Sequence, residues 1–150
     1  MNHRRFAYPM LTVTALAFAL LAAAPVVAGG RPFSTTLSGP SEVPAGDPDA
    51  TGTATVWVNP GTGTVCYDWS VTNAATPILA AHIHHAVAGV AGPVVVPLPP
   101  TGLSSGTGCT TGVDRSLALD IIRHPWDYYV NTHNAEFPTG AARGQLSRTP

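Results

Sequence analysis

The sequence predicts an all-β domain, a Greek-key-like antiparallel β-sandwich or barrel with one short helix, stapled by one disulfide. First, 15 glycines and 15 prolines punctuate the 150 residues instead of filling one tract. Second, short runs with β-type alternation lie between them, a spacing typical of sandwiches and barrels. Third, the chain holds an even number of cysteines, two, behind a leader typical of exported proteins.

Residues 1–28 have the layout of a secretory signal peptide. Two arginines come early, and no charged residue follows them until Arg31. Residues 11–24 are almost wholly apolar, and small residues precede a cleavage point after Ala28. We therefore expect a single secreted domain over residues 29–150, located outside the cell or in the cell envelope.

Alternatives stay open for this leader. Cleavage after Ala24 also fits the small-residue rule. An apolar stretch of about 20 residues can span a bilayer, so an uncleaved anchor is the second alternative. The Arg4-Arg5 pair raises the twin-arginine export route, although the rest of that signal matches poorly.

The charge of the predicted mature domain excludes two classes of partner. Without Arg4 and Arg5, five arginines stand against eight acidic residues, a net charge of −3, and the chain has no lysine. Nucleic-acid binding depends on cationic contacts with phosphate, and anionic membranes attract basic segments. We expect neither nucleic acid nor, after signal cleavage, a membrane as partner.

The predicted strands are short runs between turn signals. Residues 53–58 and 64–72 both alternate between apolar and polar side chains, and the Asn-Pro-Gly-Thr-Gly turn between them predicts a β-hairpin. The prolines of segment 93–100 favour an edge strand there. Residues 102–108 are predicted as a flexible loop. The other predicted strands are 33–37, 78–84, 94–98, 127–133 and 142–147.

One helix is predicted, over residues 116–123. Leu117, Leu119, Ile121 and Ile122 supply its apolar side, and Pro125 ends it. Ser116 is predicted as its N-cap.

Cys66 and Cys109 are predicted to form a disulfide, since export leads to an oxidising compartment. The bond would close a loop of about 44 residues, which the chain-entropy account values at roughly 4 kcal/mol as an upper figure. Two free buried thiols are the alternative.

Two histidine-bearing segments predict a metal site. In a strand, His82 and His84 point to one face, with side chains roughly 6–7 Å apart along the chain. If the strand that ends at His133 pairs beside them, His133 becomes a third ligand. Three imidazoles with an open position suit copper or zinc. Structural or surface histidines are the alternative, and His85 and His124 are expected to take those roles.

Two further residues could support such a site. Glu42 lies in a rigid Ser-Glu-Val-Pro turn that could aim its carboxylate, and Arg143 could pair with that carboxylate. The alternatives are a solvent-exposed Glu42 and a salt bridge that only pins the terminal strand. The sequence has no G-x-S-x-G or H-E-x-x-H motif.

Six segments, in order, resemble the CHRD domain, the repeated module of chordin that also occurs singly in bacterial secreted proteins. They are LSGPSEVP (37–44), TGTA (51–54), AAHIH (80–84), AGVAGPVVV (88–96), YYVNTH (128–133) and FPTGAARGQL (137–146). The resemblance spans about residues 33–147 and implies an extracellular β-sandwich-like domain without implying an enzyme. The family pattern matches at Glu42, His82, His84, His133, Arg143 and Gln145.

The sequence therefore predicts a secreted, non-enzymatic binding module. Its partner is expected to be an extracellular protein or a metal ion, copper or zinc. In chordin, the resembling modules belong to an antagonist of growth factors of the bone morphogenetic protein type. A structural domain without metal is one alternative. A metal-dependent oxidoreductase is another, by analogy with the His-x-His strand of copper/zinc superoxide dismutase.

Overall fold

The computed structural model describes residues 29–149, which fold into nine strands, one α-helix and two short 3-10 helices. The predicted signal peptide lies outside these residues. No helix within them combines the length and the apolar character needed to cross a membrane. The elements are β1 (Arg31–Ser38), η1 (Gly39–Ser41), β2 (Thr51–Asn59), β3 (Thr64–Thr72), β4 (Ala80–His85), β5 (Val94–Pro97), β6 (Ser105–Thr111), α1 (Arg115–Arg123), η2 (Pro125–Asp127), β7 (Tyr128–His133), β8 (Ala142–Gln145) and β9 (Ser147–Arg148).

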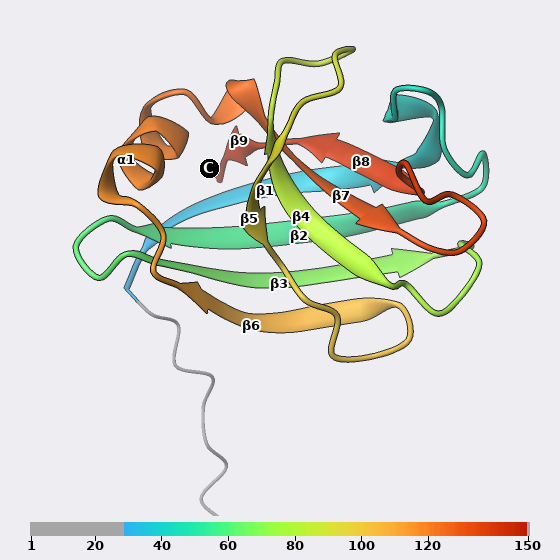
Figure 1. Cartoon of the computed structure of the whole chain (residues 1–150), viewed down its shortest axis with the longest axis horizontal. Coiled ribbons are helices and arrows are strands. Elements are labelled where there is room, and N and C mark those ends of the chain that lie inside the picture. The colour runs from blue at the N-terminus through green and yellow to red at the C-terminus, as the bar shows by residue number, and fades with distance from the viewer. Residues whose placement is uncertain (1–28, 150) are drawn as a thin grey trace, which may run out of the picture.

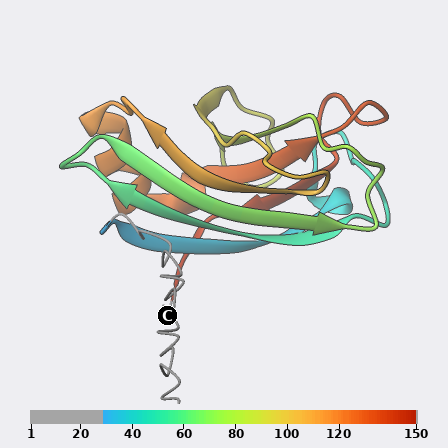
Figure 2. The same cartoon turned by 90° about the horizontal axis from the view of Figure 1, so that it is seen from below.

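The strands form one antiparallel sheet that curls into a nearly closed barrel (Figure 1). Their order is β5-β4-β7-β8-β1-β2-β3-β6, and β9 pairs with β1. Seen from below, the two halves of the curved sheet face each other (Figure 2). The all-β antiparallel prediction is confirmed, including its single α-helix and its disulfide.

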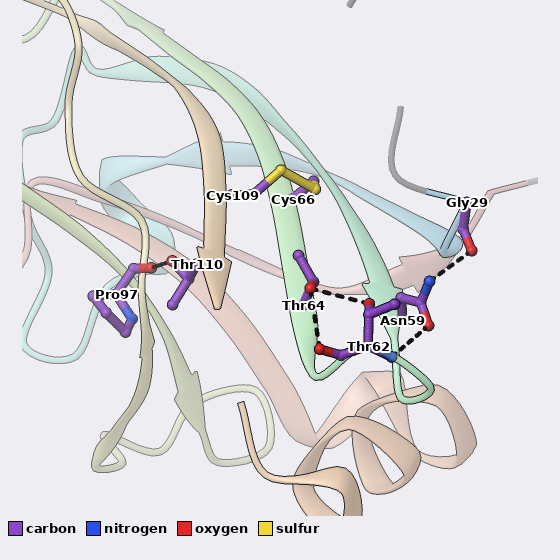
Figure 3. The surroundings of a disulfide bond; sticks show 8 residues. All are labelled: Gly29, Asn59, Thr62, Thr64, Cys66, Pro97, Cys109 and Thr110. Atoms are coloured by element: carbon purple, nitrogen blue, oxygen red, sulfur yellow. Dashed lines mark hydrogen bonds between the residues drawn. A yellow bond between two sulfur atoms is a disulfide. The ribbon is translucent and has the colours of Figure 1, made fainter. Parts of the chain in front are cut away.

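Side chains bridge the seam between the edge strands β5 and β6. Trp69 on β3 donates its indole N–H to Leu98 O at 3.1 Å, and the Tyr67 hydroxyl lies 3.2 Å from Pro99 O. The Thr110 hydroxyl donates to Pro97 O, as Figure 3 shows. These bonds bring the segment after β5 over the inner face of β3. The predicted edge position of β5 is confirmed, since β4 is its only strand partner within residues 29–149.

The core lies inside the barrel, where alternate residues of each strand point inward. Trp69, Phe33, Val56 and Ile83 are buried there. Helix α1 adds Ala118 and Ile121 to the same cluster. The predicted helix is confirmed, but Ser116 is not its N-cap. Asp114 takes that role and accepts hydrogen bonds from the backbone N–H groups of Ser116 and Leu117.

The predicted β2–β3 hairpin forms, with Asn59 opposite Thr64. The Asn59 side chain accepts from Gly61 N at 2.9 Å. It also accepts from Thr62 N at 3.2 Å, as Figure 3 shows, and the two bonds close the turn. Gly63 has a φ of +62°, a conformation that glycine adopts at little cost.

The predicted flexible loop over residues 102–108 is wrong from Ser105 onward, where β6 begins, whereas residues 102–104 do lie outside any strand or helix. The side chains of β6 are mostly exposed, so no apolar alternation marks this strand in the sequence. Its glycines serve close packing instead of flexibility. A Cβ on Gly106 would lie 2.5 Å from the Trp69 indole nitrogen, and one on Gly108 would lie 3.0 Å from the Tyr67 hydroxyl.

The predicted strand over residues 142–147 is divided into β8 and β9. Leu146 separates them and donates its N–H to Tyr128 O at 2.9 Å. This bond turns Leu146 into the core, where it is buried.

Cys66 and Cys109 face each other on β3 and β6 and form the predicted disulfide (Figure 3). They are 43 residues apart in sequence. The bond therefore fixes β6, an edge strand with few apolar side chains, to the centre of the hairpin sheet.

Replacing both cysteines, as Cys66→Ser/Cys109→Ser, should destabilise the domain by up to about 4 kcal/mol, because the unfolded chain regains its loop entropy. Thermal unfolding should shift down by up to about 15 °C. Dithiothreitol should lower the midpoint of the wild type and leave that of the variant unchanged. Equal midpoints for the oxidised wild type and the variant would contradict this account.

Candidate metal centre

The pairing of β4 with β7 positions the histidines. The register places Ala80 opposite His133, His82 opposite Asn131 and His84 opposite Tyr129. Because side chains alternate along a strand, these polar residues share the sheet face that is turned away from the core. Their neighbours Ile83 and Val130 fill the core side.

The three predicted ligands come together. His82, His84 and His133 each offer a ring nitrogen within 4.8 Å of those of the other two. His82 Nδ1 lies 3.2 Å from His133 Nε2. Two nitrogens bound to one tetrahedral zinc ion are about 3.3–3.4 Å apart, from zinc–nitrogen bonds of about 2.0–2.1 Å. The His82–His133 pair is already close to this separation.

Backbone carbonyls fix the tautomers of two of these rings. His84 Nδ1 lies 2.9 Å from Gly92 O, and His133 Nδ1 lies 3.1 Å from Pro138 O. A carbonyl only accepts, so in the neutral ring each Nδ1 carries the proton and each Nε2 carries a lone pair. His84 Nε2 is buried and has no hydrogen-bond partner. Carbonyl support of this kind is typical of metal-binding histidines.

The electrostatics of the cluster keep the rings neutral. Burial, and then the neighbouring His133 and His84, lower the pKa of His82 to about 4. Burial is also the main cause that lowers the pKa of His84 and of His133. A metal ion binds the neutral form of imidazole, so at pH 7 the cluster is in its binding form.

Arg143 holds the loop behind His84. Its side chain is 2% exposed, and its guanidinium lies 3.3 Å from the centre of the Tyr129 ring. It donates to Val90 O at 2.8 Å and Val87 O at 3.0 Å. The Tyr129 ring stacks on His84, with centres 4.8 Å apart. The guanidinium therefore anchors the 86–93 loop, which carries the carbonyl that orients His84.

The expected salt bridge between Arg143 and Glu42 is wrong. Among the described residues, the only ion pair within 4.0 Å joins His124 to Asp120. The guanidinium is instead satisfied by backbone carbonyls and by Gln145 Oε1 at 3.2 Å. Gln145 supports the same loop, because its amide donates to Ala86 O at 2.7 Å.

Glu42 is buried, which contradicts the alternative that it is exposed to solvent. Its side chain is 6% exposed, and Oε1 has no hydrogen-bond partner. A Cβ on Gly140 would lie 2.4 Å from the Glu42 carboxyl carbon, so glycine leaves the space that the carboxylate fills. Burial raises the pKa of Glu42, while Asn131, Val43 N–H and Arg143 oppose the rise.

The other two histidines among residues 29–149 lie outside the cluster. His85 is exposed and stacks on Tyr128, with ring centres 4.7 Å apart. His124 ends helix α1 with Nδ1 2.9 Å from Asp120 Oδ1.

Sequence reasoning missed Asn131 and Tyr129. Both lie an even number of residues before His133, so in a strand their side chains point to the same face as His133. That spacing was the available signal. Their proximity to His84 and His82 depends on the β4–β7 register, which the sequence does not specify.

The comparisons with known proteins agree with the sequence resemblance. The model of the CHRD domain matches residues 33–146, a range that holds the histidine cluster together with Glu42, Arg143 and Gln145. No curated protein and no solved structure matches the chain. Because the match covers most of the chain, this protein belongs to the CHRD domain family.

Proposed function

We propose that this chain is a secreted, non-enzymatic CHRD-domain protein that binds one copper or zinc ion through His82, His84 and His133. The observation that carries the proposal is the buried, unpartnered Nε2 of His84 beside two other ring nitrogens. An unsatisfied buried acceptor costs roughly 1–3 kcal/mol. A bound cation would satisfy it, and imidazole ligands suit copper and zinc.

The proposed location outside the cell rests on two supports. The leader over residues 1–28 has the composition of a signal peptide. The Cys66–Cys109 disulfide fits an oxidising compartment.

A structural domain without metal is the second candidate. It is favoured by the 3.2 Å contact between His82 Nδ1 and His133 Nε2, which a single proton can bridge. In that case the histidines join β4 to β7 directly, and their removal should lower stability whether or not metal is added.

The wild type should retain one copper or zinc ion per chain after equilibration and dialysis, measured by mass spectrometry of the metal content. The His82→Ala/His84→Ala variant should retain none, because two of three ligands are gone. His85→Ala is the matched control, since His85 lies on the same strand but stacks on Tyr128, and it should retain metal.

Two outcomes would contradict metal binding. One is a wild type without metal, and the other is unchanged retention in the double variant. A lower unfolding temperature of that variant, equal with and without metal, would support the structural candidate instead.

Metal affinity should depend less on pH than the affinity of a site built from three ordinary histidines. A proton competes with the metal for each imidazole, so affinity falls as the pH drops through each pKa. Three histidines with an ordinary pKa near 6.5 would lose roughly a thousandfold in affinity between pH 7.5 and 5.5. Here the pKa of His82 is lowered to about 4, so protonation of His82 contributes almost nothing to the loss in this range. The pKa values of His84 and His133 are lowered as well, so the total loss should stay below about a hundredfold. Competition titrations with a chelator at both pH values measure this difference, and a loss near a thousandfold would contradict it.

A further inference from the structure

Asn131 lies at the centre of the histidine cluster. It faces His82 across the β4–β7 pair and is 1% exposed. Its Oδ1 lies 3.0 Å from His133 Nε2. Its side chain also lies near enough to His84 to influence the charge of that ring. An asparagine this deeply buried brings one accepting oxygen and one donating NH2 group to the site.

The Asn131 amide turns its oxygen to the rings, since Oδ1 lies 3.0 Å from His133 Nε2. Glu42 is buried against Gly140 and also interacts with this amide. An ionised carboxylate only accepts hydrogen bonds, so Glu42 in that form suits the NH2 end of the amide and leaves Oδ1 for the rings. Gly140 makes this arrangement possible, because any Cβ there would occupy the place of the carboxylate.

The centre of the histidine cluster holds more lone pairs than protons. Gly92 O and Pro138 O take the Nδ1 protons of His84 and His133, so both Nε2 atoms present lone pairs. Asn131 Oδ1 adds another acceptor. Of the neutral groups, only His82 can bring a proton into the cluster, through Nδ1. Four electron-pair donors thus share at most one hydrogen, a shortage that one cation would relieve for all four together.

We propose that Asn131 Oδ1 is a fourth protein ligand, which completes a closed site of three imidazole nitrogens and one amide oxygen for a divalent zinc or copper ion. This inference rests on the proposed function of His82, His84 and His133. Closed sites with four protein ligands are typical of structural metals, whereas catalytic zinc keeps an open position. The fourth ligand therefore makes the ion a fixed part of the module and leaves no position for a substrate, which separates this site from that of an oxidoreductase.

X-ray absorption at the zinc edge of the zinc-loaded full chain tests the ligand set directly. We expect three imidazoles and one oxygen in the first shell. Cobalt(II) then reports whether a position is open, because azide binds only where a protein ligand is missing. Azide should leave the cobalt spectrum of the wild type unchanged and should shift that of Asn131→Ala.

The zinc affinity of the variants gives an independent readout. Asn131→Ala should bind zinc about ten- to a hundredfold more weakly. Asn131→Asp keeps an oxygen at the same place and should bind at least as tightly as the wild type. Asn134→Ala is the matched control, since Asn134 is also buried but bonds to Ala75 O and Phe137 N, and its affinity should stay unchanged.

The orienting role of Glu42 has its own matched pair, because the chain has only two glutamates. In Glu42→Gln the new amide can donate, so Asn131 is free to turn, and zinc affinity should fall several-fold. Glu136→Gln removes the same charge from an exposed position and should leave the affinity unchanged. Equal affinity in both variants would overturn the role of Glu42.

Different results overturn different claims. A wild type that binds neither zinc nor cobalt refutes the proposed function itself. A wild type that binds zinc, but whose cobalt spectrum shifts with azide as that of Asn131→Ala does, refutes only the fourth ligand. So does an Asn131→Ala affinity within twofold of the wild type. If Asn131→Ala does not fold, the absorption spectrum of the wild type and the affinity of Asn131→Asp decide the question.

Discussion

Six backbone pairs join β4 to β7, and the whole polar cluster depends on their register. The pairing sets His82 beside Asn131 and His84 beside Tyr129, all on the face away from the core. A slip of one residue would turn Ile83 outward and the histidines into the barrel, because side chains alternate with a period of two. Burial of the apolar side chains on the core side of β4 and β7 therefore fixes the register that places the histidines on the opposite face.

The cluster brings together several polar and charged groups whose burial costs free energy. His84, Asn131 and Arg143 are buried on a sheet face that an ordinary barrel leaves to water, and Glu42 is buried in the turn that follows η1. Arg143 is compensated by the carbonyls of Val87 and Val90 and by the Tyr129 ring. Glu42 Oε1 and His84 Nε2 are not compensated. Buried polar groups without a hydrogen-bond partner are rare in native proteins, and they mark positions where binding of a ligand or another function, and not stability, determines the residue.

The segment 86–93 gives the cluster its cover. Arg143 and Gln145 bond to its carbonyls from β8, and Gly92 bonds to both His84 and Tyr129. A Cβ on Gly92 would lie 2.1 Å from His85 O, so this glycine is required for the loop to close against β4. Arg143 and Gln145 thus share a physical role, which is to hold the loop whose Gly92 carbonyl orients the His84 ring.

The sequence by itself determined the all-β class, the hairpin, the helix and which three histidines lie together, because each follows from local alternation, turn residues or spacing. It did not reveal β6, because its glycines pack against Trp69 and Tyr67 and its exposed side chains carry no pattern. Only the tertiary structure decided that Glu42 is buried, that Arg143 bonds to carbonyls and that Asn131 lies among the imidazoles. These facts depend on which strands pair and in which register, and that pairing is set by the packing of the complete barrel.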